Sequence, residues 1–455
     1  MNKPNIVLIL TDHFRRDALR PDLTPNLMKL ARQGTQFVNA YSASPLCQPA
    51  RNCIITGMHA GDNGITGNQQ PPLPEDLRAD TFMRKLQSAG YYTAMVGKHH
   101  YIDRYGIGVD VTADNEDVKA YGFDRVFQVV DDGENAHNQD EYTKWLDSQG
   151  RLEEFRDTLG GSNAPAAANS GGHPYPPDDT ADGFIGVNGI RFVEQYHEDK
   201  PFYLNLSFIG PHPPFWHPGN TRDHLADGMP VKGAEDSPAL RQMRNKYLEK
   251  CALIDSYVGR LLQALEDKGA LDNTVIIFTG DHGDMLGNHG IWDKRYFYEE
   301  SVGIPLFMSG GSVPAEQRMC GTRLSKSLVS HLDLYPTILD LAGVSRERHR
   351  KRPGKSLLRV LSEEVSGHDH VIAELATAMM IRTANWKLVY DPESGGVQQL
   401  FNLVRDPEEL NNLSGVPGYE SVTADLIEKL LANKIRRSQI TQAKEEQRLQ
   451  RVHVA

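Results

Sequence analysis

The chain has 455 residues, a length beyond the size at which one hydrophobic core keeps growing, so we expect one large domain and a smaller appended one. Its formal net charge of −11 argues against a nucleic-acid surface. An enzyme for anionic substrates would then concentrate positive charge in a cleft, for which Arg51, Lys98 and Lys294 are candidates. The four cysteines follow no disulfide or zinc spacing and indicate a reducing compartment.

The first predicted element is a short apolar strand over residues 6–10, which ends at Thr11 and Asp12. The run is too short for a signal-peptide core or a membrane span, so we expect a cytoplasmic protein with no membrane association. Its β-branched and leucine residues are typical of a strand buried on both faces of a parallel sheet. Asp12 therefore lies at the carboxyl end of this strand, where open α/β sheets bind their ligands.

Helical and strand patterns then alternate along most of the chain. The predicted elements are, in chain order, a helix over 24–33, a helix over 82–89, a strand over 92–96, a strand over 202–208, a helix over 237–267 and a strand over 274–279. The last strand leads directly into Asp281 and His282. This alternation predicts an α/β fold with a large, mostly parallel sheet flanked by helices.

The pattern changes in two places. Between residues 106 and 182 the periodicity fades, and the Gly, Ala, Ser, Asn and Pro content of 160–179 predicts a variable insertion, either a disordered surface loop or a substrate-covering lid. After about residue 365, short strand patterns predict a small antiparallel sheet, followed by a charged helical tail. We therefore predict a catalytic domain over 1–364 and a C-terminal subdomain over 365–455. The tail could pack on another subunit, so a homo-oligomer is one of the expected possibilities.

The stretch from Pro45 to Gly57 is the most informative in the chain. Its Cys-x-Pro-x-Arg core places Cys47 and Arg51 on what we expect to be a short proline-stiffened turn, with a rigid cationic fork suited to tetrahedral oxyanions. Seen alone, the core could be a buried structural cysteine in a turn. A thiol-based phosphatase loop would need an arginine six positions after the cysteine, and that position holds Cys53. A simple thiolate phosphatase is therefore disfavoured.

This stretch resembles the signature of the sulfatases, members of the alkaline phosphatase superfamily, in which the cysteine is oxidised after translation to Cα-formylglycine. Gln48 departs from the family, which usually has a small residue there. The resemblance extends from Asn5 to about Leu413 and leaves out only the insertion and the tail. It implies an alkaline phosphatase-like fold and a partner, a formylglycine-generating or sulfatase-maturating enzyme, that converts Cys47.

Two acid–histidine pairs, Asp12 with His13 and Asp281 with His282, follow strands. Carboxylate oxygens and imidazole nitrogens bind divalent cations, although either pair alone could be an aspartate that caps a helix. Sulfatases commonly have Asp-Asp and Asp-Asn here, and the second pair resembles the phosphonate monoester hydrolase branch. We predict one divalent ion held by Asp12, Asp281, His282 and the group from Cys47, with His13 as a further ligand. The family implies calcium, and two imidazoles make manganese an alternative, with magnesium a third.

Further catalytic residues are implied by three more motifs of the family. The run Gly-Lys-His-His at 97–100 is similar to Gly-Lys-x-His, in which Lys98 would neutralise a sulfate oxygen and His100 would act as base at the formylglycine hydrate. His212, between prolines, matches the leaving-group histidine, and Lys294 matches a sulfate-binding lysine. Without the family context, a surface turn explains the first motif and a proline-rich connector the second.

The resemblance implies hydrolysis of a small-molecule or saccharide sulfate ester to an alcohol and inorganic sulfate. A hydrated aldehyde has one hydroxyl to attack sulfur and a second to expel sulfate, which a plain cysteine lacks. The alternatives are a phosphonate monoester or phosphodiester hydrolase with the same site, which His282 favours, and a non-catalytic oxyanion-binding relic. We expect the insertion and the loops near Trp216 and Trp292 to form the pocket wall. The remaining cysteines are predicted to be packing residues: Cys53, Cys251 and Cys320.

Overall fold

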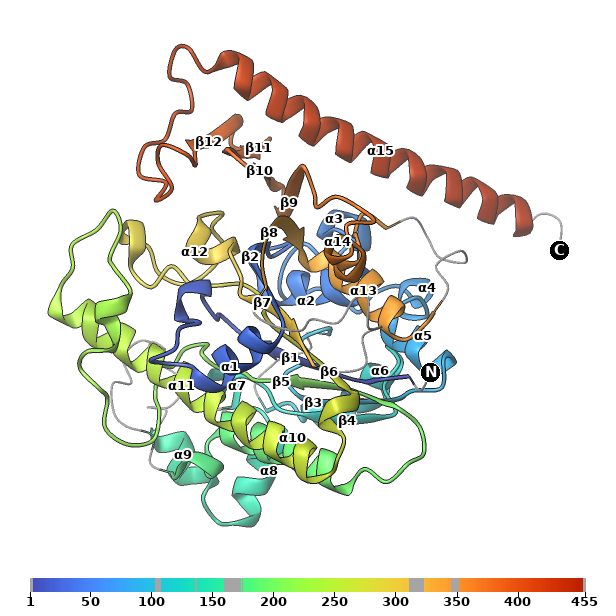
Figure 1. The fold of residues 1–455 in the computed structure, drawn as a ribbon, viewed down its shortest axis with the longest axis vertical. Coiled ribbons are helices and arrows are strands. Elements are labelled where there is room, and N and C mark those ends of the chain that lie inside the picture. Colours follow the sequence, from blue (N-terminus) through green and yellow to red (C-terminus); the bar gives the residue numbers. More distant parts are fainter. Residues whose placement is uncertain are drawn as a thin grey trace.

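A large mixed sheet forms the centre of the molecule (Figure 1). The computed structural model describes residues 3–102, 108–135, 137–158, 173, 175–310, 323–344 and 352–452, without the side chains of 134, 135 and 438–452. The eight strands lie in the order β4-β3-β5-β1-β6-β7-β2-β8. Only β7 among these strands runs antiparallel to its neighbours. The predicted α/β fold with a mostly parallel sheet is therefore confirmed.

The elements follow the predicted alternation closely. The strands of the central sheet are β1 (Asn5–Thr11), β2 (Thr35–Tyr41), β3 (Tyr92–Gly97), β4 (Arg125–Gln128), β5 (Phe202–Ser207), β6 (Thr274–Gly280), β7 (Leu306–Ser309) and β8 (Arg323–Ser330). The α-helices of this part of the chain are α1 (Pro25–Gln33), α2 (Cys47–Thr56), α3 (Ala60–Asn63), α4 (Glu75–Arg78), α5 (Phe82–Ser88), α6 (Asn115–Lys119), α7 (Asp132–Asn135), α8 (Glu141–Ser148), α9 (Leu152–Thr158), α10 (Ala181–Gln195), α11 (Pro238–Asp267), α12 (Glu299–Val302), α13 (Leu334–Leu341) and α14 (Leu357–Leu361).

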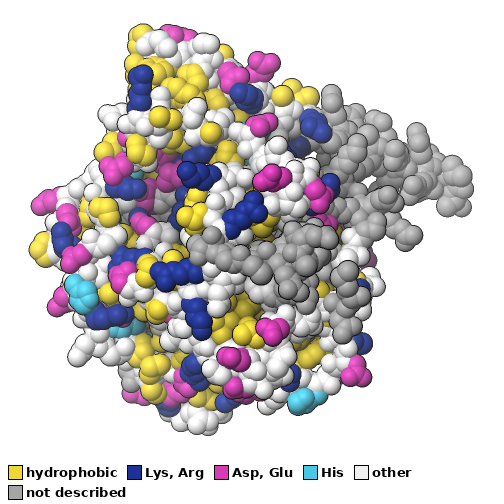
Figure 2. Space-filling model, in the orientation of Figure 1, with side chains coloured by type: hydrophobic (Ala, Val, Ile, Leu, Met, Phe, Trp, Pro, Cys, Tyr) yellow, Lys and Arg dark blue, Asp and Glu magenta, His cyan; other side chains and the backbone are white. Residues whose placement is uncertain are grey.

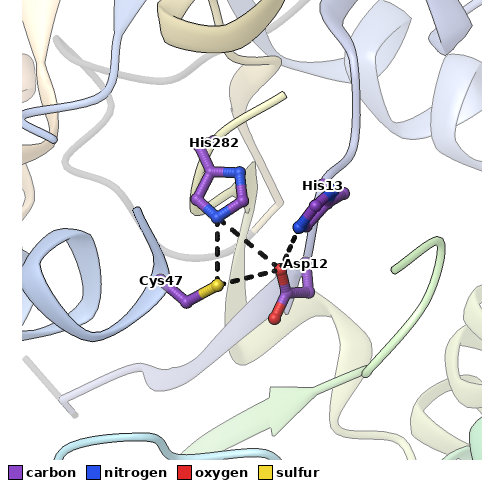
Figure 3. A group of neighbouring side chains, drawn as sticks. All are labelled: Asp12, His13, Cys47 and His282. Carbon is purple, nitrogen blue, oxygen red and sulfur yellow. Dashed lines mark hydrogen bonds and ion pairs between the residues drawn. The ribbon is translucent and has the colours of Figure 1, made fainter. Parts of the chain in front are cut away.

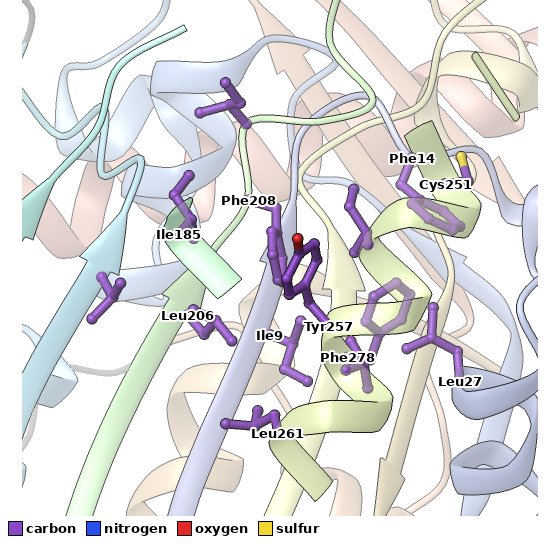
Figure 4. Close-up of a cluster of buried hydrophobic side chains, with 14 of the residues drawn as sticks. Ile9, Phe14, Leu27, Ile185, Leu206, Phe208, Cys251, Tyr257, Leu261 and Phe278 are labelled. Atoms are coloured by element: carbon purple, nitrogen blue, oxygen red, sulfur yellow. The ribbon is translucent and has the colours of Figure 1, made fainter. Parts of the chain in front are cut away.

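Helices cover both faces of the central sheet, and a hydrophobic core fills each interface. Alternate residues of β1 enter opposite cores, with Val7 and Ile9 on one side and Leu8 and Leu10 on the other. Helices α1, α10 and α11 pack over the first face, and α2, α5 and α13 over the second (Figure 1). Figure 4 shows the first core, where Cys251 lies among aliphatic and aromatic side chains. This two-sided burial explains the unbroken apolar run of β1.

The segment 106–182 contributes to the edge of the central sheet. Its strand β4 pairs in parallel with β3, and helices α6 to α9 surround that strand in the sequence. Residues 159–172, which contain most of the segment for which a loop or a lid was expected, lie outside the described residues. The division at residue 364 stays a prediction.

The C-terminal part forms the expected small antiparallel sheet. Its strands, in the order β12-β11-β10-β9, are β9 (His370–Leu375), β10 (Ala378–Thr383), β11 (Trp386–Asp391) and β12 (Gly396–Asn402). The charged tail is one long helix, α15 (Glu420–Val452), which packs on this sheet through Leu426 and Leu430 and extends past it in Figure 1. Within the described part of the chain, no helix combines the length and apolarity that a membrane crossing needs.

Lys and Arg side chains lie interspersed with Asp and Glu side chains on the face shown in Figure 2. Neither sign of charge dominates this face.

Candidate active site

The carboxyl ends of the parallel strands bring the predicted site residues to one edge of the sheet. Asp12 directly follows β1, Lys98 follows β3, and Asp281 follows β6. His212 lies in the loop after β5, which is the neighbour of both β1 and β3. Because these strands share one direction, residues that are far apart in the sequence become neighbours here.

Cys47 and Arg51 lie on a helix rather than on the expected short turn. Cys47 is the first residue of α2, and Arg51 follows one helical turn later on the same face. Pro49 is compatible with the helix because the first turn needs no backbone N–H donor from that residue. The helix ends at Gly57, which has a positive φ of 62°. The signature motif therefore fixes the nucleophile position at a helix N-terminus.

The guanidinium of Arg51 is buried and is bound by four groups from the strand ends. Its Nε donates to Asp281 Oδ2 at 2.8 Å, and its Nη2 contacts Asp12 Oδ2 at 3.4 Å. Its Nη1 donates to the carbonyl of Lys98 at 2.8 Å and to Ser207 Oγ at 2.9 Å. Arg51 therefore links the carboxylates of Asp281 and Asp12, and its role as an anion clamp stays a prediction.

Four buried side chains converge on one point (Figure 3). The Oδ1 atom of Asp12 lies 3.6 Å from His13 Nε2, 3.7 Å from His282 Nε2 and 3.6 Å from Cys47 Sγ. The Cys47 sulfur lies 3.2 Å from His282 Nε2. In a matured sulfatase-type site, this sulfur would be replaced by the oxygen atoms of a formylglycine hydrate. One carboxylate, two imidazoles and the group at position 47 thus form a donor set suited to a divalent cation.

Hydrogen bonds at the opposite ring nitrogens orient both imidazoles. His282 Nδ1 donates to the carbonyl of Gly283 at 2.9 Å, and His13 Nδ1 donates to Asp284 Oδ2 at 2.7 Å. The Nε2 atom of each ring therefore faces the donor set. Burial would lower the pKa of His282, but the charges of Asp281 and Cys47 raise it to about 9, so a metal ion at this site would displace a proton from this ring. Burial, followed by the nearby charge of Lys294, lowers the pKa of His13 well below its usual value, which keeps this ring neutral.

Asp284 was missed by the sequence analysis, although it follows Asp281 by only three residues. Nothing in the sequence distinguishes it from a surface acid. Its role depends on its hydrogen bond with His13, which lies 271 residues away in the sequence. Asp281 itself borders the donor set, since its Oδ1 lies 3.6 Å from His282 Nε2. That oxygen also accepts the backbone N–H groups of His282 at 2.8 Å and His13 at 3.3 Å.

Lys98 lies between two carboxylates. Its Nζ forms a short contact with Asp12 Oδ2 and contacts both oxygens of Asp131, at 2.7 and 2.6 Å. Burial would lower the pKa of Lys98, but Asp12 and Asp131 raise it well above its usual value. Asp131 was also missed, although an apolar stretch precedes it as one precedes Asp12 and Asp281. Its strand, β4, is short and lies in the segment where the periodicity fades.

Lys294 is the third buried cation of the site, after Arg51 and Lys98. Its Nζ lies 2.6 Å from His13 Nε2 and 3.1 Å from His212 Nε2. The Nδ1 of His212 donates to the carbonyl of Pro213 at 2.7 Å, so its Nε2 is the atom that faces the site. Burial lowers the pKa of His212, so its protonated form gives up a proton readily.

The reactive centre opens into a cavity of about 580 Å³. Cys47, His100, His212 and Lys294 are among the predicted site residues that line it. The predicted insertion contributes Asp131 and Gly133 to the wall, and the loop after Trp292 contributes Lys294 and Arg295. Trp216 itself is buried and donates to Asp132 at 3.1 Å. His217, next to Trp216, hydrogen-bonds with Thr221 and does not line the cavity.

The electrostatic surroundings separate Cys47 from the other described cysteines. Burial and the carboxylate of Asp12 would raise the pKa of Cys47, but Lys294 and Lys98 hold it well below its usual value. Burial instead raises the pKa of Cys53 and of Cys251, as expected for packing residues, and all three are free. Cys320 lies outside the described residues.

Comparisons with known proteins identify the family. A family model described as Sulfatase matches residues 4–344, and a second, described as N-sulphoglucosamine sulphohydrolase, C-terminal, matches residues 287–436. The chain belongs to the sulfatase family. Choline-sulfatase from Rhizobium meliloti (strain 1021) is 30% identical to this sulfatase, covering 91% of this chain and 83% of its own. Arylsulfatase from Clostridium perfringens (strain 13 / Type A) is 28% identical, covering 95% and 94%.

The fold is shared with a solved member of the superfamily. The crystal structure of phosphonate monoester hydrolase of Agrobacterium radiobacter superposes with a TM-score of 0.78 at 23% identity, covering 96% of each chain. This likeness confirms the alkaline phosphatase-like fold. The family match and the related sulfatases identify the protein as a sulfuric ester hydrolase, in a family of the alkaline phosphatase superfamily.

The burial of Arg51 generates a stability prediction. Arg51→Met keeps much of the side-chain volume but leaves Asp12 and Asp281 without their shared cation, so the free energy of unfolding should fall by about 3–5 kcal/mol. Cys53→Ala, in the same buried helix, is the control and should cost no more than about 2 kcal/mol. Chemical denaturation followed by circular dichroism measures both. A smaller loss for Arg51→Met than for the control contradicts this role.

Proposed function

We propose that this sulfatase hydrolyses sulfate esters with a formylglycine hydrate at position 47 and one divalent metal ion. The observation that supports it is the place of Cys47, which is the first residue of α2, lines the cavity and lies among Asp12, His13 and His282. Because Cys47 is buried in the folded chain, a formylglycine-generating or sulfatase-maturating enzyme would have to reach it before folding is complete.

The residues present fit a divalent ion. Their ligand atoms lie within 4.8 Å of one another, and the two imidazoles are already oriented by hydrogen bonds. Asp12, His13, His282 and the group at position 47 would hold the ion, with Asp281 beside them. When bound, such an ion supplies Lewis acidity that favours the ionised hydrate. Calcium is the ion that the family implies, with manganese or magnesium as alternatives that two imidazoles allow.

The hydrolysis would proceed in two steps. One hydroxyl of the hydrate attacks sulfur, so an oxygen–sulfur bond forms and the bond from sulfur to the alcohol oxygen breaks. His212 gives the leaving alcohol its proton, while Lys98 and Lys294 balance the charge on the other sulfate oxygens. His100 then takes the proton of the second hydroxyl, sulfate leaves with its bonding electron pair, and the aldehyde that remains is hydrated by water.

Each of these side chains acts either on the transition state or in a proton transfer. Loss of any one of the side chains should therefore reduce the rate by roughly 10²–10⁴. Asp131 limits the negative charge that the site can accept, because it neutralises part of the charge of Lys98. The site should thus suit esters that carry one negative charge better than dianions.

Phosphonate monoester or phosphodiester hydrolysis is the second candidate. These esters are also monoanions, and His282 stands where sulfatases commonly have asparagine. The same nucleophile, cations and proton donor would serve both elements. The non-catalytic relic is disfavoured because Cys47 and Lys294 line the cavity, the candidate metal ligands surround Cys47, and Lys98 contacts Asp12 among them.

The choice between sulfur and phosphorus is tested by comparing kcat/KM on matched aryl esters. Protein with verified conversion of Cys47 should hydrolyse 4-nitrophenyl sulfate best and bis(4-nitrophenyl) phosphate and 4-nitrophenyl phenylphosphonate measurably. It should hydrolyse the dianion of 4-nitrophenyl phosphate poorly. If the phosphorus monoanions are better by more than about tenfold, or about 1.4 kcal/mol in transition-state stabilisation, the second candidate replaces the first.

The role of Cys47 is tested against that of Cys53, six residues later on the same helix. Cys47→Ala should abolish turnover because the hydrate cannot form, and Cys53→Ala should keep it because its sulfur is only packed. Peptide mass spectrometry should find the aldehyde, about 18 Da lighter than cysteine, at position 47 alone. Equal loss of activity in both variants, with folding intact, would contradict the assignment.

The metal site is tested by metal content as well as by activity. Purified protein should contain about one divalent ion per chain, and chelation should abolish an activity that added metal restores. Asp284→Asn should lower the metal affinity about 10–100-fold, because the ring of His13 loses its orienting partner. His217→Ala, a buried histidine outside the site, is the control. Full activity in protein shown to be metal-free would rule the site out.

A further inference from the structure

The outer wall of the catalytic cavity contains a cation that the proposed mechanism does not use. Arg295 is exposed and lines the cavity next to Lys294. Among the described residues, none forms a hydrogen bond or an ion pair with its guanidinium. Lys98 is held by Asp12 and Asp131, and Lys294 contacts His13 and His212. Among the described residues that line the cavity, Arg295 is thus the one cation to which the proposed mechanism gives no role.

The backbone around Arg295 holds it in this position. Asp293 and Arg295 have positive φ angles of 68° and 78°, which are unusual for residues other than glycine and cost free energy. The backbone N–H of Arg295 also donates to the carbonyl of Pro45 at 3.0 Å, two residues before Cys47. The loop therefore directs two consecutive side chains, Lys294 and Arg295, to one cavity and fixes them relative to the nucleophile position.

The rest of the outer wall is polar and lacks the features that other substrate classes need. Thr66, Asn68 and Gln69 contribute hydroxyl and amide groups, and Leu375 and Ala376 contribute a small apolar surface from the C-terminal sheet. The described lining contains no Phe, Tyr or Trp, against which an aryl group or a quaternary ammonium group would pack. Its carboxylate, Asp131, is already paired with Lys98 and is not free to bind a cationic substrate.

We propose that Arg295 binds a second anionic group, a carboxylate or a sulfate, on the alcohol part of the substrate. The polar wall fits a polyhydroxylated alcohol, so the substrate class is an acidic saccharide that carries the reacting sulfate ester and another acid. An arginine fork matches the planar carboxylate and the oxygens of a sulfate equally well. A cavity of about 580 Å³ is within the range that binds such small molecules. This inference rests on the proposed function and adds the identity of its substrate.

The test uses two pairs of sugars that differ in one charge. The first pair is N-acetylglucosamine 6-sulfate and glucosamine N,6-disulfate, and the second is glucose 2-sulfate and glucuronate 2-sulfate. The measured quantity is the ratio of kcat/KM for the more charged member over the less charged member. In protein with verified formylglycine, this ratio should be about tenfold or more in at least one pair, as expected for a charge-assisted contact.

Variants assign this preference to Arg295. Arg295→Gln should bring the ratio close to one, and Arg295→Lys should keep part of it because the charge remains. Arg405→Gln, which changes an exposed arginine in the C-terminal part, is the control and should match the unmodified protein. Added salt should reduce the ratio, since the contact is electrostatic. The inference is overturned if neither pair shows a preference, or if Arg295→Gln affects both members of a pair equally.

A failure of the proposed function would look different. In that case, protein with verified formylglycine would hydrolyse neither these sugars nor 4-nitrophenyl sulfate. Binding then tests Arg295 without turnover, by titration calorimetry of the Cys47→Ala protein with glucosamine N,6-disulfate and N-acetylglucosamine 6-sulfate. Tighter binding of the disulfate that Arg295→Gln abolishes supports the inference, and equal binding of the two sugars overturns it.

Discussion

The buried guanidinium of Arg51 is the interaction on which the site depends. It bonds to Asp281 and Asp12, to the carbonyl of Lys98 and to Ser207, which come from the ends of four neighbouring strands. Two carboxylates without a cation would be costly to bury side by side, and arginine stays charged at any physiological pH. The same helix that carries Arg51 also carries Cys47, so the group that neutralises the acids sets the place of the nucleophile.

Other charged side chains around Arg51 also have partners within the site. Lys98 is shared by Asp12 and Asp131, and Asp284 orients His13 toward the donor set. The interior of the site is thereby nearly balanced in charge before any ligand binds. Such a site gains most from a ligand that brings one negative charge, which is the property that sulfate esters share with phosphodiesters and phosphonate monoesters.

The inner and outer parts of the cavity have different structural origins. The reacting centre is built from the carboxyl ends of strands in a sheet with a packed core on each face, so its geometry is rigid. The outer wall comes from loops around residues 66–69 and 295 and from the turn after β9. Loop surfaces can change without disturbing the core, so this wall decides which alcohol is accepted while the centre decides the chemistry.

By itself, the sequence determined the alternation of strands and helices, the strand ends that carry Asp12, Lys98 and Asp281, and the signature around Cys47. Those features depend on local periodicity and on short-range spacing. Only the tertiary structure decided the partners: Asp131 on Lys98, Asp284 on His13, and Arg51 as a link between two acids. It also brought the loop after Trp292 to the cavity wall through Lys294 and Arg295, while Trp216 packs inside the protein. Contacts across 33 to 271 residues of chain leave no local pattern, because they arise only when the sheet aligns its strand ends.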